Sequence, residues 1–390
     1  MRRRSATTLL VALLSLLFIH PVATAAPAAF THPGVLVSRA QLDFVRGQVT
    51  AGAQPWKSAY DQMLASPYAS LSRTPKPRAV VECGPYSNPN IGCTDERQDA
   101  LAAYSLALAW YVTRDSRYAE KAIAIIDAWS GTITSHTNSN APLQTGWAGS
   151  AWPRAGEILR YSYTGWSAAS IGRFSTMLRN VYLSKVIGGS NSNGNWELVM
   201  LEAAVGISVF LDDKASYDKA MAKFRDRVPA YVYLSSDGPL PKTTPGSGLN
   251  TRDKIISYWQ GQSTFTDGLA QETCRDFTHT GYGLASISDV AETSRIQGVD
   301  LYSTDVGERL RQALGLHAKY ELGAAVPSSL CGGHLKLGLG PVTEVGFNAL
   351  HTRLGIAMAN TQTLTERNRP AGTNALFVAW ETLTHANNPN

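Results

Sequence analysis

Apolar residues recur at helical spacing along most of this chain. Helices are predicted at 95–115 and 115–130, and the break between them is so short that they must form an antiparallel hairpin. Further helices are predicted at 152–163, 166–186, 195–213, 214–234, 267–297, 303–321, 343–359 and 372–385. Loops rich in Gly, Asn and Pro separate them at 131–150, 187–195, 235–251 and 322–342. We therefore predict an all-α fold: a single domain over 26–390 in which helical hairpins form an α/α toroid and loops border a cleft.

Residues 1–25 have the organisation of a secretory signal peptide. A basic start is followed by an apolar run over 9–19 and by small residues up to Ala25. The run is shorter than a membrane-spanning helix requires. We expect cleavage near Ala25 or Ala26, secretion, and no stable membrane association.

The charge balance of the chain gives no support for a nucleic-acid partner. The whole chain has 35 Lys and Arg against 30 Asp and Glu, and three of the Arg lie in the signal peptide. The remaining excess of positive charge is very small, whereas nucleic-acid-binding domains are strongly basic.

The four cysteines of an exported chain predict two disulfides. Cys83 and Cys93 flank a loop rich in Pro, Gly and Asn, so we pair them, which leaves Cys274 with Cys331. The two other connectivities remain open. The chain contains neither a C-x-x-C nor an H-E-x-x-H motif, so we expect no metal and no cofactor. We also expect a monomer.

Several common chemistries lack their motifs in this chain. No serine lies in a G-x-S-x-G motif, and no phosphate-binding glycine loop is present. A glycoside hydrolase that uses two carboxylates remains possible. Its candidate residues are Glu157, Glu202, Glu272 and Asp276.

The stretch QETCRDFTHTGYG, residues 271–283, concentrates charged and proton-transferring side chains. On a helix over 267–291, one face would carry Gly268, Glu272, Arg275, His279 and Tyr282. A separate apolar stripe would dock the helix: Leu269, Phe277, Leu284, Ile287 and Ala291. The competing interpretation is a solvated face on which Glu272 contacts Arg275.

An Arg, a His and a Tyr on one face suit β-elimination on a uronic-acid polysaccharide. Removal of the C5 proton becomes feasible when Arg, Asn or His donors neutralise the adjacent carboxylate as negative charge develops. A Tyr or His must take that proton, and a Tyr or His must protonate the leaving oxygen. We expect Glu272 and Asp276 to orient Arg275 and His279.

A second candidate stretch is GGSNSNGNWELVMLEA, residues 188–203. Asn195 could present its amide to a sugar carboxylate, and Trp196 could stack on a sugar ring. The alternative is a turn with a helix cap, which Asn favours, and this reading applies most to Asn191 and Asn193.

Weaker candidates lie elsewhere in the chain. Tyr258 is a rival to Tyr282 for the catalytic Tyr, with core packing as its alternative role. Further candidates for substrate binding are Arg154 beside Trp152, His334 near Cys331, and the cluster Asn348, His351 and Arg353. Arg353 could bind a second uronate carboxylate or form a surface ion pair. No functional role is expected for His136 or His317.

Three motifs together resemble the secreted alginate-lyase-domain proteins, with polysaccharide lyase family 38 as the nearest group. They are Asn195-Trp196, the string Q-E-x-x-R-D-x-x-H-T at 271–280, and QGVDLY at 297–302. The resemblance spans about residues 32 to 385. It implies an α/α toroid and cleavage of polyuronates such as alginate or β-1,4-glucuronan.

The resemblance also implies roles for individual residues. Asn195, Arg275 and His279 would act around the carboxylate. Older alginate lyases of similar fold place a His directly after their Asn, where this chain has Trp196, so His279 is the expected histidine. Those enzymes carry a Tyr seven residues after the Arg, as Tyr282 follows Arg275 here.

The sequence thus predicts a secreted polysaccharide lyase that cleaves a 1,4-linked polyuronate, with an acidic polysaccharide as its partner. Two alternatives stay open: an α/α-toroid glycoside hydrolase that uses two carboxylates, and a non-catalytic protein that binds acidic polysaccharide.

Overall fold

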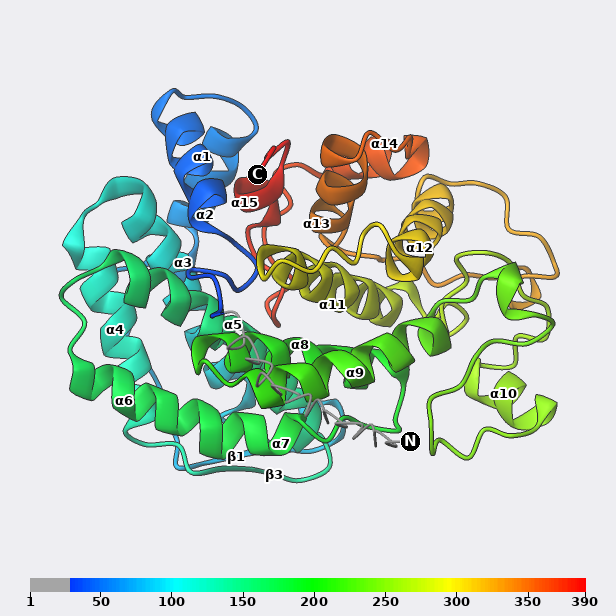
Figure 1. Ribbon diagram of the computed structural model, residues 1–390, viewed down its shortest axis with the longest axis horizontal. Coiled ribbons are helices and arrows are strands. Elements are labelled where there is room, and N and C mark those ends of the chain that lie inside the picture. The colour runs from blue at the N-terminus through cyan, green and yellow to red at the C-terminus, as the bar shows by residue number, and fades with distance from the viewer. Residues whose placement is uncertain (1–28) are drawn as a thin grey trace, which may run out of the picture.

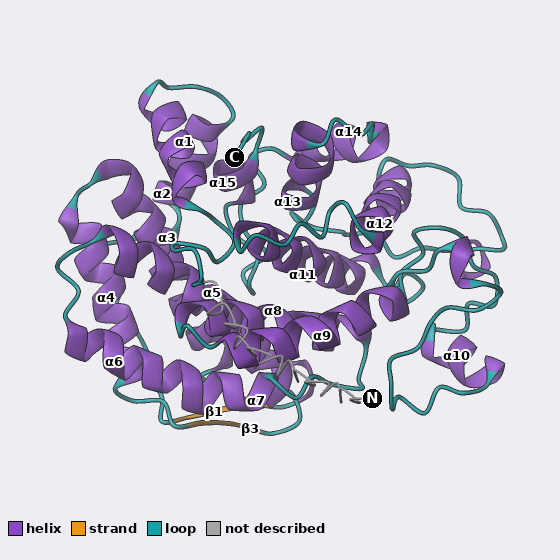
Figure 2. Cartoon of the chain, in the orientation of Figure 1, coloured by secondary structure: helices purple, strands orange, loops and turns teal. Residues whose placement is uncertain are grey.

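A computed structural model describes residues 29–390, and most of them are helical (Figures 1 and 2). The predicted signal peptide, 1–25, lies outside the described residues. The helices are α1 (Arg39–Thr50), α2 (Trp56–Ala65), α3 (Cys93–Thr113), α4 (Ser116–Ser130), α5 (Ala141–Ser162), α6 (Ala168–Met177), α7 (Ser184–Val186), α8 (Gly194–Phe210), α9 (Lys214–Tyr231), α10 (Arg252–Tyr258), α11 (Phe277–Ile296), α12 (Asp305–Glu321), α13 (Glu344–Phe347), α14 (Ala359–Asn368) and α15 (Glu381–His385).

Four helices form the inner layer of the molecule: α3, α5, α8 and α11. α5 packs against both α3 and α8, and α8 packs against α11. Every residue of α8 except Trp196 is buried, and α3, α5 and α11 are buried over most of their length. These helices therefore show no strong amphipathic pattern, as expected for helices enclosed on all sides.

The outer layer consists of helices that are apolar on one side only. In α4 the buried positions are Ala119, Ala122, Ile125, Ile126 and Trp129, which follow the three-to-four spacing of a single helical face. α4 returns along α3 and α9 along α8, so each of these two pairs forms a hairpin, and α12 packs against α11 at an angle (Figure 1). The successive hairpins predicted from the sequence are therefore present.

Several predicted helix boundaries are wrong. The helix predicted at 267–297 begins only at Phe277, because the Asp276 side chain caps its first turn by accepting from the His279 backbone N–H. The helix predicted from 152 begins at Ala141 instead, inside a segment predicted to be a loop. Within the predicted helix at 372–385, only Glu381–His385 is helical.

A small three-stranded sheet was not predicted. Strand β1 (Val80–Cys83) pairs antiparallel with β2 (Asn90–Ile91). On its other side it pairs parallel with β3 (Ser135–Thr137) (Figure 2). The predicted disulfides Cys83–Cys93 and Cys274–Cys331 are both formed. The first closes the turn between β1 and β2 onto the start of α3. Within residues 29–390, no helix is long and apolar enough to span a membrane.

Candidate active site

A groove of about 540 Å³ opens where the first turns of three inner helices meet. Its wall comes from the N-terminal parts of α5, α8 and α11, together with the disulfide-closed loop after β1. The lining residues are Pro85, Tyr86, Ser87, Asn140, Leu143, Trp147, Ser192, Asn193, Trp196, Arg275, His279 and Tyr282. No Asp or Glu belongs to this lining, while Arg275 does. The groove therefore suits an anionic ligand.

The segment 268–276 is held in an irregular conformation beside the end of α9. Backbone hydrogen bonds join Gly268 N to Tyr233 O and Gln271 N to Tyr231 O, each at 2.8–2.9 Å. Gly268 has a φ of 84°, and a Cβ there would lie 2.3 Å from the carbonyl oxygen of Gln312, so only glycine fits. The Cys274–Cys331 disulfide fixes the other end of the segment.

Glu272 is fully buried and collects donors from three parts of the fold. Its carboxylate accepts from Arg275 Nη1 at 2.8 Å, from Asn195 Nδ2 at 2.7 Å and from the Tyr231 hydroxyl at 3.2 Å. Asn195 also donates its backbone N–H, at 3.1 Å. The Arg275 side chain is 25% exposed, so its guanidinium is anchored on the buried side and faces the groove on the other.

His279 is oriented by Asp276. Its Nδ1 lies 2.8 Å from both carboxylate oxygens of Asp276, and its backbone N–H donates to one of them at 2.7 Å. An ionised carboxylate can only accept, so Nδ1 carries the proton. A neutral His279 ring then has its lone pair on Nε2. The ring lines the groove and is 30% exposed, so Nε2 is available as a base.

Tyr282 lies one turn further along α11. Its ring packs edge-on against His279 at 5.6 Å and Trp147 at 6.3 Å between centroids. Burial raises the pKa of Tyr282 above its ordinary value, and the Asp276 charge adds to this, while Arg97 and Arg275 oppose it. The phenol is therefore protonated near neutral pH and can act as a proton donor.

The predicted Arg275, His279 and Tyr282 thus meet in one groove, although they do not share one helix face as expected. Arg275 precedes the helix, and only His279 and Tyr282 belong to α11. Glu272 and Asp276 hold the arginine and the histidine, as expected.

Asn195 and Trp196 occupy different environments. Trp196 lines the groove. Asn195 is fully buried, and its amide nitrogen is engaged by both oxygens of Glu272, so it does not face a sugar carboxylate. In its place, Ser192 and Asn193 of the preceding loop reach the groove.

Tyr258 lies outside the groove lining, at the end of α10. Its hydroxyl donates to the Ser192 carbonyl oxygen at 2.7 Å and accepts from Arg227 Nη1 at 3.2 Å. It therefore supports the 188–193 loop from behind.

The prediction that Arg154 lines the cleft is wrong. Arg154 is 1% exposed inside α5, where it pairs with Glu202 and, at 2.8 Å, with Asp289. It also donates to the Phe377 carbonyl oxygen at 2.9 Å. Its neighbour Trp152 is likewise buried. The charge of Arg154 compensates core carboxylates and is not available to a ligand.

The C-terminal candidates also lie away from the groove. Asn348 is buried and donates to the Asn388 carbonyl oxygen at 3.0 Å. His351 Nδ1 lies 2.8 Å from the carbonyl oxygen of Ile356. Arg353 forms an ion pair with the fully buried Glu292 at 2.6 Å, and His334 is exposed in its loop. None of these four residues lines the groove.

The sequence interpretation missed several residues of the groove. Trp147 and Asn140 were assigned to a loop, because the turn of α5 that carries Trp147 is rich in Gly, Ala and Ser. Tyr86 is 93% exposed at the groove. Its position between paired cysteines was the available signal for a presented aromatic residue. Arg97 lies behind Trp147, with its guanidinium carbon 5.3 Å from the ring centroid.

No group of three or more His, Cys, Asp or Glu side chains is placed to hold a metal ion within the part of the chain that the structure describes.

The helical hairpins define an α/α-toroid protein, and the lining of its groove contains an arginine and no carboxylate. The sequence profile of the alginate lyase family matches residues 50–243. The chain belongs to this family and is a polysaccharide lyase. A search of curated protein sequences found no significant match.

Solved structures of alginate lyases share the fold. Alginate lyase A1-III from Sphingomonas species A1 aligns with a TM-score of 0.62 and 14% identity, over 92% of this chain and 97% of that one. An alginate lyase from Bacteroides ovatus aligns with a TM-score of 0.58 and 13% identity, over 91% and 99%. A histidine-to-alanine variant of A1-III complexed with a tetrasaccharide aligns with a TM-score of 0.61 and 15% identity, over 94% of this chain and 98% of that one. The predicted α/α toroid is thereby confirmed.

Proposed function

We propose that this lyase cleaves alginate or a related 1,4-linked polyuronate by β-elimination, which leaves an unsaturated uronate at the new chain end. One observation carries the proposal. An anchored arginine, a carboxylate-oriented histidine and a protonated tyrosine converge on a groove without a carboxylate in its lining. A family whose relatives include a tetrasaccharide-bound enzyme supports it.

Each side chain has a distinct part in the proposed reaction. Arg275 pairs with the uronate carboxylate and stabilises the enolate-like charge that develops when C5 loses its proton. His279 Nε2 takes that proton, and Asp276 stabilises the resulting imidazolium. Tyr282 donates its proton to the glycosidic oxygen as the C4–O bond breaks. Asn195 has a positioning role, since it shares Glu272 with Arg275.

The two-carboxylate hydrolase has little support from the positions of its acids. Glu157 bonds His32, Glu202 pairs with Arg154, and Glu272 is fully buried. Asp276 is bound to His279 and does not belong to the groove lining. Such an enzyme needs two carboxyl groups facing one another across the scissile bond.

The sequence next to Asn195 and the disulfides bear on the narrower family, the substrate and the location of the protein. Trp196 directly after Asn195 favours polysaccharide lyase family 38 over the older alginate lyases, and it keeps β-1,4-glucuronan as a substrate beside alginate. The two disulfides are consistent with secretion into an oxidising compartment. We propose an acidic polysaccharide as the partner of a monomeric protein.

The test is an incubation of the mature protein with polymannuronate, polyguluronate, glucuronan and a neutral glycan. Ultraviolet absorbance of the unsaturated uronate should grow with an acidic glycan only. His279→Ala should abolish this growth, whereas His334→Ala, a histidine outside the groove, should retain it. Equal loss in both variants, or saturated reducing ends alone, would contradict the proposal.

A further inference from the structure

Arg97 differs from the other deeply buried arginines of the described chain. Within residues 29–390, four arginines are less than 9% exposed: Arg97, Arg154, Arg227 and Arg309. The last three donate directly to carboxylates. Arg154 pairs with Glu202 and Asp289, Arg227 with Glu197, and Arg309 with Asp237. Arg97 donates to the amide oxygen of Gln144 at 2.5 Å and to the hydroxyl of Thr94 at 3.3 Å. Its positive charge therefore has only neutral hydrogen-bond partners.

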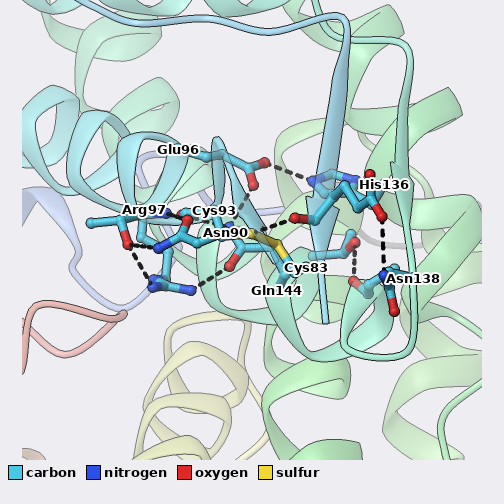
Figure 3. Close-up of a disulfide and its surroundings, with 12 residues drawn as sticks. Cys83, Asn90, Cys93, Glu96, Arg97, His136, Asn138 and Gln144 are labelled. Atoms are coloured by element: carbon cyan, nitrogen blue, oxygen red, sulfur yellow. Dashed lines mark hydrogen bonds and ion pairs between the residues drawn. A yellow bond between two sulfur atoms is a disulfide. The ribbon is translucent and has the colours of Figure 1, made fainter. Parts of the chain in front are cut away.

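A buried charge without a direct counter-charge is unfavourable unless something compensates it. Glu96 is the nearest carboxylate along the hydrogen-bond network, but Gln144 separates the two, donating to Glu96 at 2.6 Å (Figure 3). Glu96 in turn is occupied by His136 at 2.7 Å and by the Tyr182 hydroxyl. The network fixes the position of the guanidinium, and Glu96 acts on its charge only from the far side of Gln144.

The Arg97 guanidinium lies next to the wall of the groove. The guanidinium carbon lies 5.3 Å from the ring centroid of Trp147, which lines the groove and packs on Tyr282. Arg97 Nε and Trp147 Nε1 are both buried and have no hydrogen-bond partner among the residues that the structure describes. Both atoms are donors. A cation without a direct ion pair, 5.3 Å from a ring that lines the groove, favours a negatively charged ligand there through its electrostatic field.

We propose that Arg97 is a second cationic determinant of specificity, which selects polyanionic sugar chains by its charge from behind Trp147, while Arg275 contacts the carboxylate of the reacting sugar. This inference rests on the proposed function, because it assumes that a polyuronate occupies the groove. Burial lowers the pKa of Arg97, and the charge of Glu96 opposes this, yet arginine stays protonated near neutral pH. The charge is therefore permanent.

Thr94 offers a way to neutralise this charge without removing the arginine. Thr94 lies in the first turn of α3, is half-buried, and is not part of the groove lining. Thr94→Asp would place a carboxylate within reach of Arg97 Nη2, at a helix N-terminus where an acid is well tolerated. The asparagine of Thr94→Asn has nearly the same shape as that aspartate and carries no charge, so this variant is the matched control.

The experiment measures binding by calorimetry, with His279→Ala as the parent so that the ligand is not consumed. The probes are a mannuronate tetrasaccharide and its carboxyl-reduced, neutral counterpart. Arg97→Gln and Thr94→Asp should each raise the Kd for the charged probe about tenfold and reduce its dependence on salt. Neither should change the Kd for the neutral probe. Arg97→Lys and Thr94→Asn should bind the charged probe like the parent.

Arg160→Gln, on α5, controls for loss of an arginine that is stacked on an aromatic ring away from the groove. Arg160 is partly buried over the Phe210 ring, at the opposite end of α5 from the groove, and should not affect binding. Unchanged binding of the charged probe in Arg97→Gln or Thr94→Asp would overturn the inference. Equal weakening for both probes would do the same. If Arg97→Gln does not fold, the comparison of Thr94→Asp with Thr94→Asn in binding the charged probe tests the inference instead. Absence of binding by the parent would instead contradict the proposed function, and the inference with it.

Discussion

Asp276 has two roles at the residue scale. Its side chain caps α11 by accepting from the His279 backbone N–H, and the same carboxylate accepts from His279 Nδ1. One residue thus sets where the helix starts and which nitrogen of the histidine faces the groove. Stability and catalysis depend on different properties of this side chain, because capping needs an oxygen and orientation of an imidazolium needs a charge.

Asp276→Asn separates the two roles. Asn caps helices about as well as Asp, so the free energy of unfolding should change by less than about 0.5 kcal/mol. The kcat should fall at least about 100-fold, because the amide neither fixes the tautomer nor stabilises the imidazolium. Asp276→Ala should lose the cap as well and cost about 1 kcal/mol. Urea unfolding and steady-state kinetics measure both effects; an Asn variant with full activity would eliminate the Asp276–His279 pair from the mechanism.

The raised pKa of Tyr282 predicts how kcat/KM behaves at alkaline pH. That pKa is raised, first by burial and then by Asp276. As a proton donor it acts in the neutral form, so its contribution persists below the ordinary tyrosine pKa of about 10 and is lost as pH rises through the higher folded value. The kcat/KM of the wild type should therefore show no decline due to Tyr282 below about pH 10. A rise in kcat/KM through that region would instead identify tyrosinate as the base.

At the scale of elements, the segment 268–276 explains both the success and the failure of the sequence interpretation. Helical spacing correctly placed the buried residues Leu269, Phe277 and Leu284, but it carried the helix one segment too far. The interruption depends on pairing with the end of α9, on a disulfide to residue 331 and on Asp276 acting as a cap. Two of these three contacts are long-range and leave no periodic signal in the sequence.

The same limit applies to the site. The meeting of Arg275, His279 and Tyr282 in one groove could be predicted because these residues lie within a stretch of thirteen residues. Trp147 could not be, since a stretch rich in Gly and Ala was interpreted as a loop. For Arg353, carboxylate binding and an ion pair both stayed open, because its partner Glu292 lies 61 residues away and nothing local reveals the pair.

The Tyr258→Phe variant tests whether α10 supports the loop that lines the groove. The Tyr258 hydroxyl holds the Ser192 carbonyl oxygen of this loop. Tyr258→Phe should raise KM a few-fold, leave kcat nearly unchanged and cost about 1 kcal/mol of stability. Tyr282→Phe should lower kcat at least about 100-fold. If Tyr258→Phe shows the larger loss of kcat, the roles of the two tyrosines are reversed.

At the scale of the whole molecule, the core contains many buried ionisable groups between its helices. Arg154, Arg227 and Arg309 each join different elements through ion pairs. His317 on α12 is fully buried, with Nε2 2.9 Å from the Thr273 hydroxyl of the site segment and Nδ1 2.7 Å from the Ala313 carbonyl oxygen. Protonation of His317 in acid therefore destabilises both the packing of α12 and the segment 268–276, which carries Arg275.

The lowered pKa of His317 predicts that the folded protein loses stability in acid. Burial lowers this pKa to about 4. The unfolded chain takes up a proton near pH 6.5 and the folded chain does not, so this stability is present above about pH 6.5 and lost as pH falls towards 4. The loss should approach about 3 kcal/mol. In urea titrations, wild type should lose stability relative to His317→Gln over this range; parallel curves for the two proteins would contradict the assignment.

Elimination in the groove can be recognised directly from the masses of the products. A defined uronate oligosaccharide is incubated with the mature protein, and each fragment is weighed by mass spectrometry. Elimination adds no water, so the fragment masses should sum to the mass of the substrate, with the new non-reducing end one water lighter than a saturated uronate. Fragments whose masses sum to the substrate plus one water would show hydrolysis and contradict the account.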